Sequence, residues 1–499
     1  MIIKIFATSD IHGRIYPYDY VNQKKLTHSL SHIDSAYTKL KNENSILVDN
    51  GDLIQGNFIE TLLEDELLPK TLNTMGYDIF NMGNHEFNFG LSTLKNILKN
   101  INATPLMANS NDNFFAPYKI IKKGNIKLAF IGINTILVNQ FENPLFLEGL
   151  KIFDPIKILD KLILKLKNEV DGIILMAHLG LKDENSINHA GIYSIVDDLK
   201  YSKYIDVIIA GHLHETININ YKGILITEPS YYGEYLSQID LEFNENKLIN
   251  KSVKLIDVKN FIPSNRINDL YKDAHKKIIK KTNEIIGTIK NSNPNDYNFN
   301  DGALAHLLTE IMLSYKYCDV VSFQLADEVI LREEITKSDF ARLSTYAGAE
   351  VTRYEITGKD LKEYMKWSYN YFTINDYGEI IKNPNRQNFK YKTLDIFGNI
   401  KYKIKISDSI EILELKYKNG NDIHDDDKLI IGMNEYRMNY LISQNGPLSN
   451  KKFKKLDSSK YVGKDFKKHG TIRELAKEYF NSLDNKTFIY NNTKLYTVI

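Results

Sequence analysis

Seven side chains of the types that bind divalent metals follow apolar segments in the first half of the chain. They are Asp10, His12, Asp52, Asn84, His178, His212 and His214. Mixed Asp, Asn and His ligands suit borderline divalent ions such as Zn²⁺, Mn²⁺ or Co²⁺. A carboxylate such as Asp52 has one oxygen for each of two ions, and an i, i+2 pair such as His212/His214 faces one site where the backbone turns out of a strand. The sequence therefore predicts a metal centre built from these residues.

The elements that must position these residues are strands that end directly before them. Apolar runs predict strands over residues 2–8, 46–49, 77–82, 172–176 and 206–210. Helical patterns lie between them, over residues 25–40, 58–75 with a possible break at Pro69, 91–99 and 156–167. Such alternation predicts a parallel sheet with helices on its faces, and open α/β sheets place ligand sites at the carboxyl ends of their strands.

The composition changes near residue 250, which suggests three segments. We expect a catalytic domain over residues 1–255, a linker over 256–295 with one long helix at 266–286, and a C-terminal domain over 296–499. The last segment reads as a smaller α+β domain, with helices over 304–315, 359–371 and 472–480 and strands over 401–406 and 428–433. The lysines of the linker helix form a solvated face.

Composition narrows the classes of partner. The chain has 499 residues, of which 43% are hydrophobic and 25% are charged, and its formal net charge is +1. No stable nucleic-acid or membrane partner is therefore expected. Cys318 is the single cysteine, so no intramolecular disulfide forms. A strand-like segment starts at Ile2 and leaves no room for a signal peptide, which predicts a cytoplasmic protein if this N-terminus is native. The oligomeric state stays open.

The metal-ligand motifs together resemble the five-block signature of the calcineurin-like metallophosphoesterases. The blocks are Asp10-Ile11-His12, Gly51-Asp52, Gly83-Asn84-His85-Glu86, His178 and Gly211-His212-Leu213-His214. The resemblance implies a four-layer α/β/β/α sandwich with two metal ions and a water or hydroxide that bridges them. It assigns the first ion to Asp10, His12, Asp52 and His214. It assigns the second ion to Asp52, Asn84, His178 and His212.

His85 follows a ligand without being needed as one. Two cations about 3.5–4 Å apart clamp the attacking and leaving oxygens of an in-line displacement at phosphorus. The best role for His85 is then catalytic, to stabilise the phosphoryl charge or to protonate the leaving oxygen. The alternative is a histidine that only caps or packs. Glu86 is better explained as a supporting residue than as a catalytic one.

The segment from Gly83 to Gly90 and the C-terminal half are similar to the 5′-nucleotidase superfamily. Within it, the branch of 2′,3′-cyclic-nucleotide 2′-phosphodiesterase/3′-nucleotidases is the most similar, because Asn88 stands where 5′-nucleotidases have an Asp that pairs with the catalytic His. By position Tyr436 matches, and Tyr346 approximately matches, two aromatics of the family that sandwich the nucleobase. Stacking tolerates every base, because each has a π-face.

This resemblance implies hydrolysis of 2′,3′-cyclic nucleotides to 3′-nucleotides, and of 3′-nucleotides to nucleosides and phosphate, by a metal-bridging hydroxide. Alternatives are a 5′-nucleotidase or nucleotide-sugar hydrolase, and a non-catalytic nucleotide-binding protein on the same scaffold. A DNA nuclease is disfavoured by the near-neutral charge. The segment Met438–Leu441 replaces the Gly-rich turn of the family, so the base and sugar preference stays open. Many relatives are periplasmic or extracellular.

Overall fold

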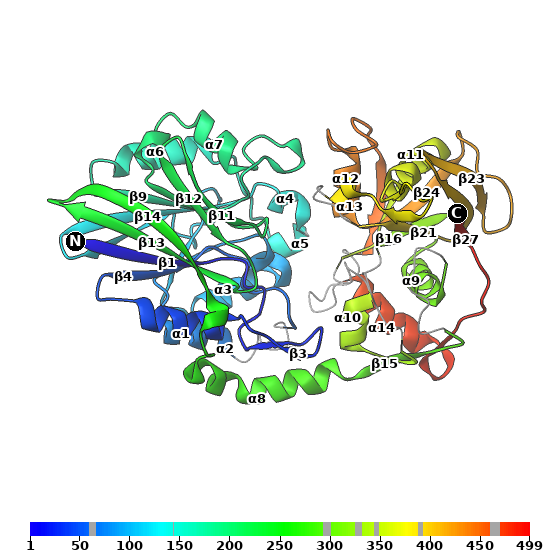
Figure 1. Cartoon of the computed structure of the whole chain (residues 1–499), viewed down its shortest axis with the longest axis horizontal. Helices are drawn as coiled ribbons and strands as arrows, with labels where there is room; N and C mark the ends of the chain where they lie inside the picture. Colours follow the sequence, from blue (N-terminus) through cyan, green and yellow to red (C-terminus); the bar gives the residue numbers. More distant parts are fainter. Residues whose placement is uncertain are drawn as a thin grey trace. The chain divides into compact units, whose positions relative to one another are not determined.

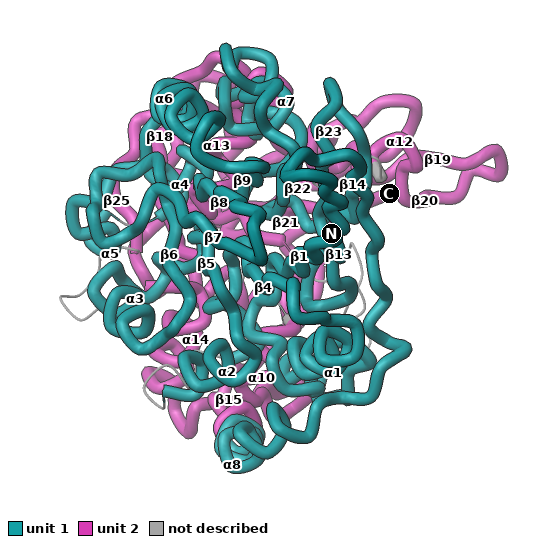
Figure 2. Tube along the Cα trace, turned by 90° about the vertical axis from the view of Figure 1, so that its left-hand side faces the viewer, with its two compact units in different colours: residues 1–280 teal, residues 281–499 magenta. Residues whose placement is uncertain are grey.

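Two folded units make up the part of the chain that the computed structural model describes. The described residues are 1–58, 66–142, 144–292, 301–324, 332–343, 349–387, 393–459 and 470–499. Unit 1 comprises Met1–Lys280 and unit 2 comprises Lys281–Ile499, shown in teal and magenta in Figure 2. The candidate metal ligands all belong to unit 1, and each unit is described by itself below.

The first sheet of unit 1 has the strand order β14-β13-β1-β4-β5-β6. The strands are β14 (Lys247–Asp257), β13 (Tyr235–Asn244), β1 (Ile2–Thr8), β4 (Ser45–Asp49), β5 (Ile79–Asn81) and β6 (Thr104–Leu106). The four strands from β1 to β6 run parallel, whereas β13 and β14 are antiparallel additions at one edge. The carboxyl ends of β1, β4 and β5 therefore meet at one edge of the sheet.

The second sheet has the order β11-β12-β10-β9-β8-β7. The strands are β11 (Thr216–Tyr221), β12 (Ile224–Pro229), β10 (Val207–Ile209), β9 (Gly172–His178), β8 (Ile126–Asn134) and β7 (Tyr118–Lys123). Again the inner four strands are parallel and the two edge strands are antiparallel. Strand β9 ends at His178 and strand β10 ends shortly before His212, so this sheet also brings ligands to its carboxyl edge.

Unit 1 is a four-layer sandwich, as Figure 1 shows. Apolar side chains of the two sheets pack against each other in one core, which contains Ile5, Val48, Ile174 and Ile209. Helices α6 (Ile156–Leu166) and α7 (Ile192–Asp198) bury their apolar faces on the outer side of the second sheet. Helices α1 (Leu30–Leu40), α2 (Leu67–Met75) and α3 (Leu91–Leu98) cover the first sheet. This arrangement confirms the predicted α/β/β/α fold.

Unit 2 is an α+β domain around its own apolar core. Its largest sheet has the order β21-β16-β24-β18-β25, formed by Asp395–Gly398, Val320–Gln324, Lys428–Met433, Thr352–Thr357 and Lys454–Ser458. Two three-stranded sheets join it, formed by β17 (Glu334–Thr336), β15 (Ile285–Lys290) and β26 (Thr487–Ile489), and by β23 (Ile410–Tyr417), β22 (Ile400–Ile406) and β27 (Tyr496–Val498). The main helices are α9 (Ala303–Leu313), α10 (Lys337–Leu343), α11 (Gly358–Tyr369), α13 (Glu435–Ile442) and α14 (Ile472–Ser482).

Two helices differ from the sequence-based expectation. The helix expected over 266–286 is α8 (Asn265–Thr282), and the chain continues as strand β15. The β-branched residues Ile285, Ile286, Thr288 and Ile289 favour the strand. The helix expected over 58–75 starts at Leu67, and residues 59–65 lie outside the described chain. No break occurs at Pro69, because a proline in the first helical turn lacks only an N–H that has no partner there.

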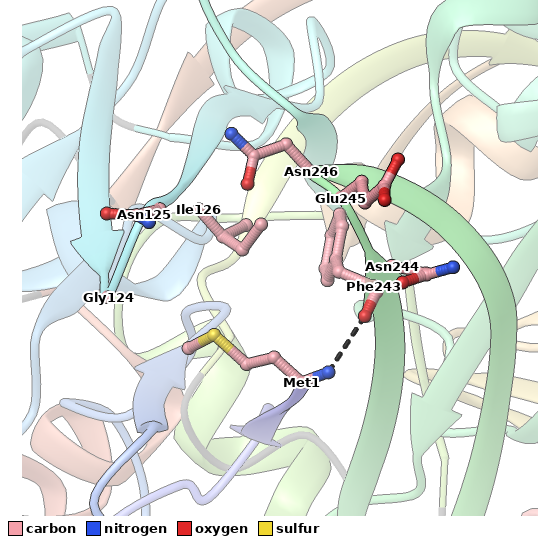
Figure 3. A pocket seen from close by; sticks show the side chains of 8 residues that line it. All are labelled: Met1, Gly124, Asn125, Ile126, Phe243, Asn244, Glu245 and Asn246. Carbon is pink, nitrogen blue, oxygen red and sulfur yellow. Dashed lines mark hydrogen bonds between the residues drawn. The ribbon is translucent and has the colours of Figure 1, made fainter.

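A pocket of unit 1 lies at the opposite end of β1 from the candidate ligands. It is lined by Met1, by the β7–β8 turn and by the β13–β14 turn, as Figure 3 shows. The amino terminus of Met1 donates a hydrogen bond of 2.8 Å to the carbonyl of Phe243 there. Among the described residues, no helix combines the length and the apolar character needed to cross a lipid bilayer.

Candidate metal centre

The loops after β1 and β4 are joined by backbone hydrogen bonds at the candidate site. Asp10 N–H donates to the Gly51 carbonyl and His12 N–H donates to the Asp52 carbonyl, each at 2.9 Å. Gly51 has φ +102°, and a Cβ there would lie 2.3 Å from the backbone nitrogen of Gly83. Only glycine fits this crossing, which brings the loop after β5 against the loop after β4.

Five of the seven predicted ligands adopt left-handed backbone conformations. Their φ angles are 55° for Asp10, 47° for His12, 58° for Asp52, 80° for His212 and 60° for His214. This region costs an ordinary side chain about 1–2 kcal/mol, and Asn, Asp and His enter it more often than others. The turn out of the strand lets residues two apart face the same point. Such conformations gather at functional sites, where the surrounding structure maintains them.

Glu86 fixes the loop that carries Asp52. Its Oε2 accepts hydrogen bonds from the backbone N–H groups of Asp52 and Gly83, both at 2.7 Å. Its Oε1 accepts from Leu53 and Ile54, at 2.8 and 3.3 Å. Glu86 is almost fully buried. It therefore organises the backbone around the ligands.

The seven predicted ligands come together in unit 1. Two groups have ligand atoms within 4.8 Å of one another, Asp10/His12/His214 and Asp52/His178/His212. Asp52 also links the groups, since its Oδ2 lies 3.1 Å from His178 Nε2 and 4.0 Å from His12 Nε2. The seventh, Asn84, places its Oδ1 2.7 Å from His212 Nδ1.

The side chains of this centre suit bound cations, because atoms with lone pairs face one another. His178 Nδ1 donates to the Asn50 carbonyl at 2.8 Å, so the neutral ring carries its lone pair on Nε2, which faces Asp52 Oδ2 at 3.1 Å. His12 Nδ1 lies 3.1–3.2 Å from two oxygens of Gln55, so its Nε2 also carries a lone pair. This Nε2 faces His214 Nε2 at 3.0 Å. Lone pairs that converge beside two buried carboxylates are the pattern of a divalent-metal site.

Buried carboxylates and imidazoles lie close together at this centre and shift one another's pKa values. Burial disfavours the charge on His178, but the carboxylates of Asp52 and Asp10 raise its pKa to about 10. Burial also acts against the ionised form of Asp52, yet the imidazoles of His178 and His85 hold its pKa well below the usual value. Burial lowers the pKa of His12 to about 4. The carboxylates therefore attract positive charge, and a proton and a metal ion compete for the same nitrogen of His178.

His85 lies beside both groups without belonging to either. Its backbone N–H donates to Asp52 Oδ1 at 2.8 Å, and its ring centre is 5.3 Å from that of His12. Its Nδ1 contacts Asn88 Oδ1 at 2.7 Å. Both residues belong to the 3₁₀ turn η2 (His85–Phe89), where a spacing of three residues puts their side chains on one side. Asn88 thus pairs with His85 as its position suggested.

Two glutamates at the site had no signal in the sequence. Glu142, at the end of α4 (Val138–Phe141), lies 2.5 Å from Asn88 Nδ2. Glu184, in the turn η3 (Glu184–Ser186), lies 2.6 Å from His212 Nε2 and is buried. A carboxylate only accepts, so it fixes the hydrogen of His212 on Nε2 and leaves the lone pair on Nδ1, which faces Asn84. Both come from loops remote in sequence from their partners.

The proposed base-binding tyrosines belong to unit 2. Tyr346 lies outside the described residues. Tyr436 is half-buried on α13, whose N-terminus is capped by the Asn434 side chain. The next residue, Arg437, is buried and pairs with Asp395, which also accepts a hydrogen bond of 2.6 Å from Tyr364. Helices α11 and α13, which carry Tyr364 and Arg437, therefore meet around one buried carboxylate.

Comparisons with known proteins identify both halves of the chain. Residues 3–216 match the calcineurin-like phosphoesterase family, and residues 285–440 match the C-terminal domain of 5′-nucleotidases. The trifunctional nucleotide phosphoesterase YfkN of Bacillus subtilis is 31% identical over 308 residues, 52% of this chain and 21% of that protein. A 2′,3′-cyclic-nucleotide 2′-phosphodiesterase/3′-nucleotidase of Haemophilus influenzae is 28% identical over 290 residues, 49% of this chain and 43% of that protein.

These matches cover less than half the length of either curated relative. Among solved structures, a putative 5′-nucleotidase from Staphylococcus aureus matches with a TM-score of 0.80 at 20% identity, over 100% of both chains. That likeness concerns the fold, and it extends through both units. Residues 3–216 thus form a calcineurin-like phosphoesterase domain, and residues 285–440 form a 5′-nucleotidase C-terminal domain.

Proposed function

We propose that this protein hydrolyses nucleotide phosphoesters with two divalent metal ions. The substrates would be 2′,3′-cyclic nucleotides, opened to 3′-nucleotides, and 3′-nucleotides, cleaved to nucleosides and phosphate. The single observation that carries the proposal is the pair of adjoining ligand groups, in which Asp52 of the second group lies 4.0 Å from His12 of the first. The relatives named as phosphoesterases support the choice of nucleotide esters, and Asn88 favours the cyclic-nucleotide branch over 5′-nucleotidases.

The ligands would divide as the resemblance implies. Asp52 would be shared between both ions. The first ion would also be held by Asp10, His12 and His214, and the second by Asn84, His178 and His212. The ions, Zn²⁺, Mn²⁺ or Co²⁺ by ligand type, would neutralise the phosphoryl oxygens and activate water.

His85 would protonate the leaving oxygen. As the P–O bond breaks, its electron pair stays on that oxygen, which takes the proton from His85 Nε2. The ring is then neutral and keeps its hydrogen on Nδ1, where Asn88 Oδ1 accepts it at 2.7 Å. A new proton from water restores His85 for the next cycle. Tyr436, with Tyr346, is proposed to stack on the base.

A substrate panel combined with metal analysis tests the proposal. Elemental analysis should find two divalent ions per chain. The values of kcat/KM should be high for 2′,3′-cyclic AMP and 3′-AMP, and low for 5′-AMP. A preference for 5′-AMP or a nucleotide sugar would instead make the protein a 5′-nucleotidase or nucleotide-sugar hydrolase. Nucleotide binding without turnover by the metal-loaded protein would show a non-catalytic binding protein.

A further inference from the structure

A chain of hydrogen bonds leads from His85 to a carboxylate outside the ligand set. His85 Nδ1 meets Asn88 Oδ1 at 2.7 Å, and Asn88 Nδ2 donates to Glu142 Oε2 at 2.5 Å. Glu142 comes from a loop 54 residues later in the sequence and is only 7% exposed. Burying a carboxylate is costly unless hydrogen bonds compensate it. The pairing with Asn88 is therefore a defined feature of the fold.

The Asn88 amide has an acceptor oxygen and a donor NH₂ group, so its orientation decides which nitrogen of His85 carries the hydrogen. A carboxylate has only acceptor atoms, so Glu142 takes the amide N–H of Asn88. The amide oxygen must then face His85, and a carbonyl oxygen can only accept. The hydrogen of the neutral imidazole is thereby fixed on Nδ1. An Asn without Glu142 would be free to turn its NH₂ group toward His85, which would favour the other tautomer.

The same chain of hydrogen bonds fixes the orientation of the His85 ring. With Nδ1 held by Asn88, the nitrogen left to exchange a proton is Nε2. His85 is also fixed through its backbone, because its N–H donates to Asp52 Oδ1. Backbone and ring are thus held by different partners, and only the ring depends on Glu142.

We propose that Glu142 is a positioning residue, which orients Asn88 so that His85 keeps its hydrogen on Nδ1 and delivers its proton from Nε2. The inference rests on the proposed function, in which His85 protonates the leaving oxygen. In 5′-nucleotidases an Asp at the position of Asn88 is charged itself. Here the carboxylate belongs to Glu142, which does not contact His85 directly and acts on it through the amide of Asn88.

The kinetic test compares leaving groups that differ in their need for a proton. The ribose oxygen of 3′-AMP leaves poorly without protonation, whereas p-nitrophenolate leaves readily. Glu142→Gln should lower kcat for 3′-AMP by about tenfold, a part of the ~10²–10⁴ that acid catalysis supplies. It should change kcat for p-nitrophenyl phosphate little and leave the metal content unchanged. Equal losses on both substrates, or a lost ion, would overturn the proposal.

A matched control comes from a second glutamate of the same region. Glu148 is exposed and accepts hydrogen bonds from Ser92, and in the described part of the chain no hydrogen bond joins it to His85. Glu148→Gln should therefore leave both substrates unaffected. If it reproduces the selective loss on 3′-AMP, the effect belongs to the loop and not to the hydrogen-bond chain.

A double variant that moves the negative charge from position 142 to position 88 provides the decisive experiment. In Asn88→Asp/Glu142→Gln, Asp at 88 accepts from His85 and Gln at 142 can donate to Asp, so the chain is complete again. The double variant should hydrolyse 3′-AMP faster than the product of the two single effects predicts. Activity equal to that product, or below it, would show that the two side chains do not act together.

A spectroscopic readout separates this inference from the proposed function. In zinc-loaded protein labelled with ¹⁵N-histidine, the His85 signals are assigned by their loss in His85→Ala. The wild type should show the hydrogen on Nδ1, and Glu142→Gln should shift the ring toward the Nε2–H tautomer. An unchanged tautomer would refute the inference even if the wild type is active. A shifted tautomer in a protein that hydrolyses no nucleotide would uphold the hydrogen-bond chain and reject the proposed function.

Discussion

Asp52 and His85 touch through a backbone hydrogen bond, but the proposal gives them different tasks. Asp52→Asn weakens the ligand shared by both ions, so metal content and turnover should fall together, turnover by several orders of magnitude. His85→Ala should keep both ions and lose about 10²–10⁴ in kcat. Elemental analysis beside steady-state kinetics distinguishes the two. If His85→Ala loses an ion, His85 is a ligand and its catalytic assignment is wrong.

Glu184 contacts the proposed ligand His212 at the ring nitrogen that would not bind the metal. It fixes the tautomer of His212 through the 2.6 Å contact with Nε2. Glu184→Gln should lower the affinity for the second ion by about 10- to 100-fold, because partners of this kind tune the ligand. Titration of the metal-free variant with Zn²⁺ measures this. Asp183→Asn, next in the chain and bonded to Ser194, is the control and should bind zinc as the wild type does.

The proposed ligands can be located from the sequence more easily than the residues that hold them in place. Residues such as Asp10 and His178 lie at the ends of buried strands. The strand pattern therefore indicates at which edge of the sheet they lie and which other side chains lie near them. Glu142 and Glu184 come from loops and are selected by contacts through space. Their roles depend on the fold of α4 and η3, which no local pattern shows.

At the scale of the element, the end of β4 carries a buried carboxyl group that the metal site does not use. Asp49 accepts hydrogen bonds from Thr8 Oγ1 and Gly51 N–H, and burial raises its pKa to about 8. The unfolded value is near 3.8. Between these values the folded protein binds a proton that the unfolded chain lacks. The free energy of unfolding therefore falls as pH rises through this window.

Asp49→Asn removes this titration and keeps the contacts with Thr8 and Gly51. From pH 5.5 to 8.5 the variant should lose less thermal stability than the wild type, with a difference on the order of several °C. Calorimetry of both proteins in the same metal state gives the comparison. Parallel Tm curves would mean that the carboxyl group of Asp49 is not protonated in the fold.

Elements were predictable where their apolar pattern is strong. Strand β1 has the predicted bounds, and α6 and β24 agree to within a residue. Strand β14 was missed, because its eleven residues are mostly polar and lie at the sheet edge beside β13. The end of α8 was placed too late, since Ile285 and Ile286 continue its apolar pattern although they start β15.

At the scale of the whole molecule, the two units carry different parts of the proposed activity. The proposed metal ligands lie in unit 1, and Tyr436 lies in unit 2. Base stacking contributes about 1–3 kcal/mol, or roughly 5- to 150-fold in affinity. Tyr436→Ala should lower kcat/KM for 3′-AMP within this range and leave bis(p-nitrophenyl) phosphate, which has no nucleobase, largely unaffected.

The exposed Tyr377 of unit 2 provides a control for this substitution. Tyr377→Ala should preserve the ratio of the two kcat/KM values, and Tyr436→Ala should change it. A ratio that Tyr436→Ala leaves unchanged would remove this tyrosine from the substrate site.

The left-handed backbone at five of the proposed ligands restricts which residues these positions can accept. At Asp10, His12, Asp52, His212 and His214, a replacement must satisfy the backbone as well as the ion. In a saturation library of these positions, sorted for folded protein without regard to turnover, Gly and Asn should survive more often than Val and Ile. Equal survival of β-branched residues would show a relaxed backbone. Selection for folding alone thus already limits the residue types at these positions. The types it retains include Asp, Asn and His, which can bind metals.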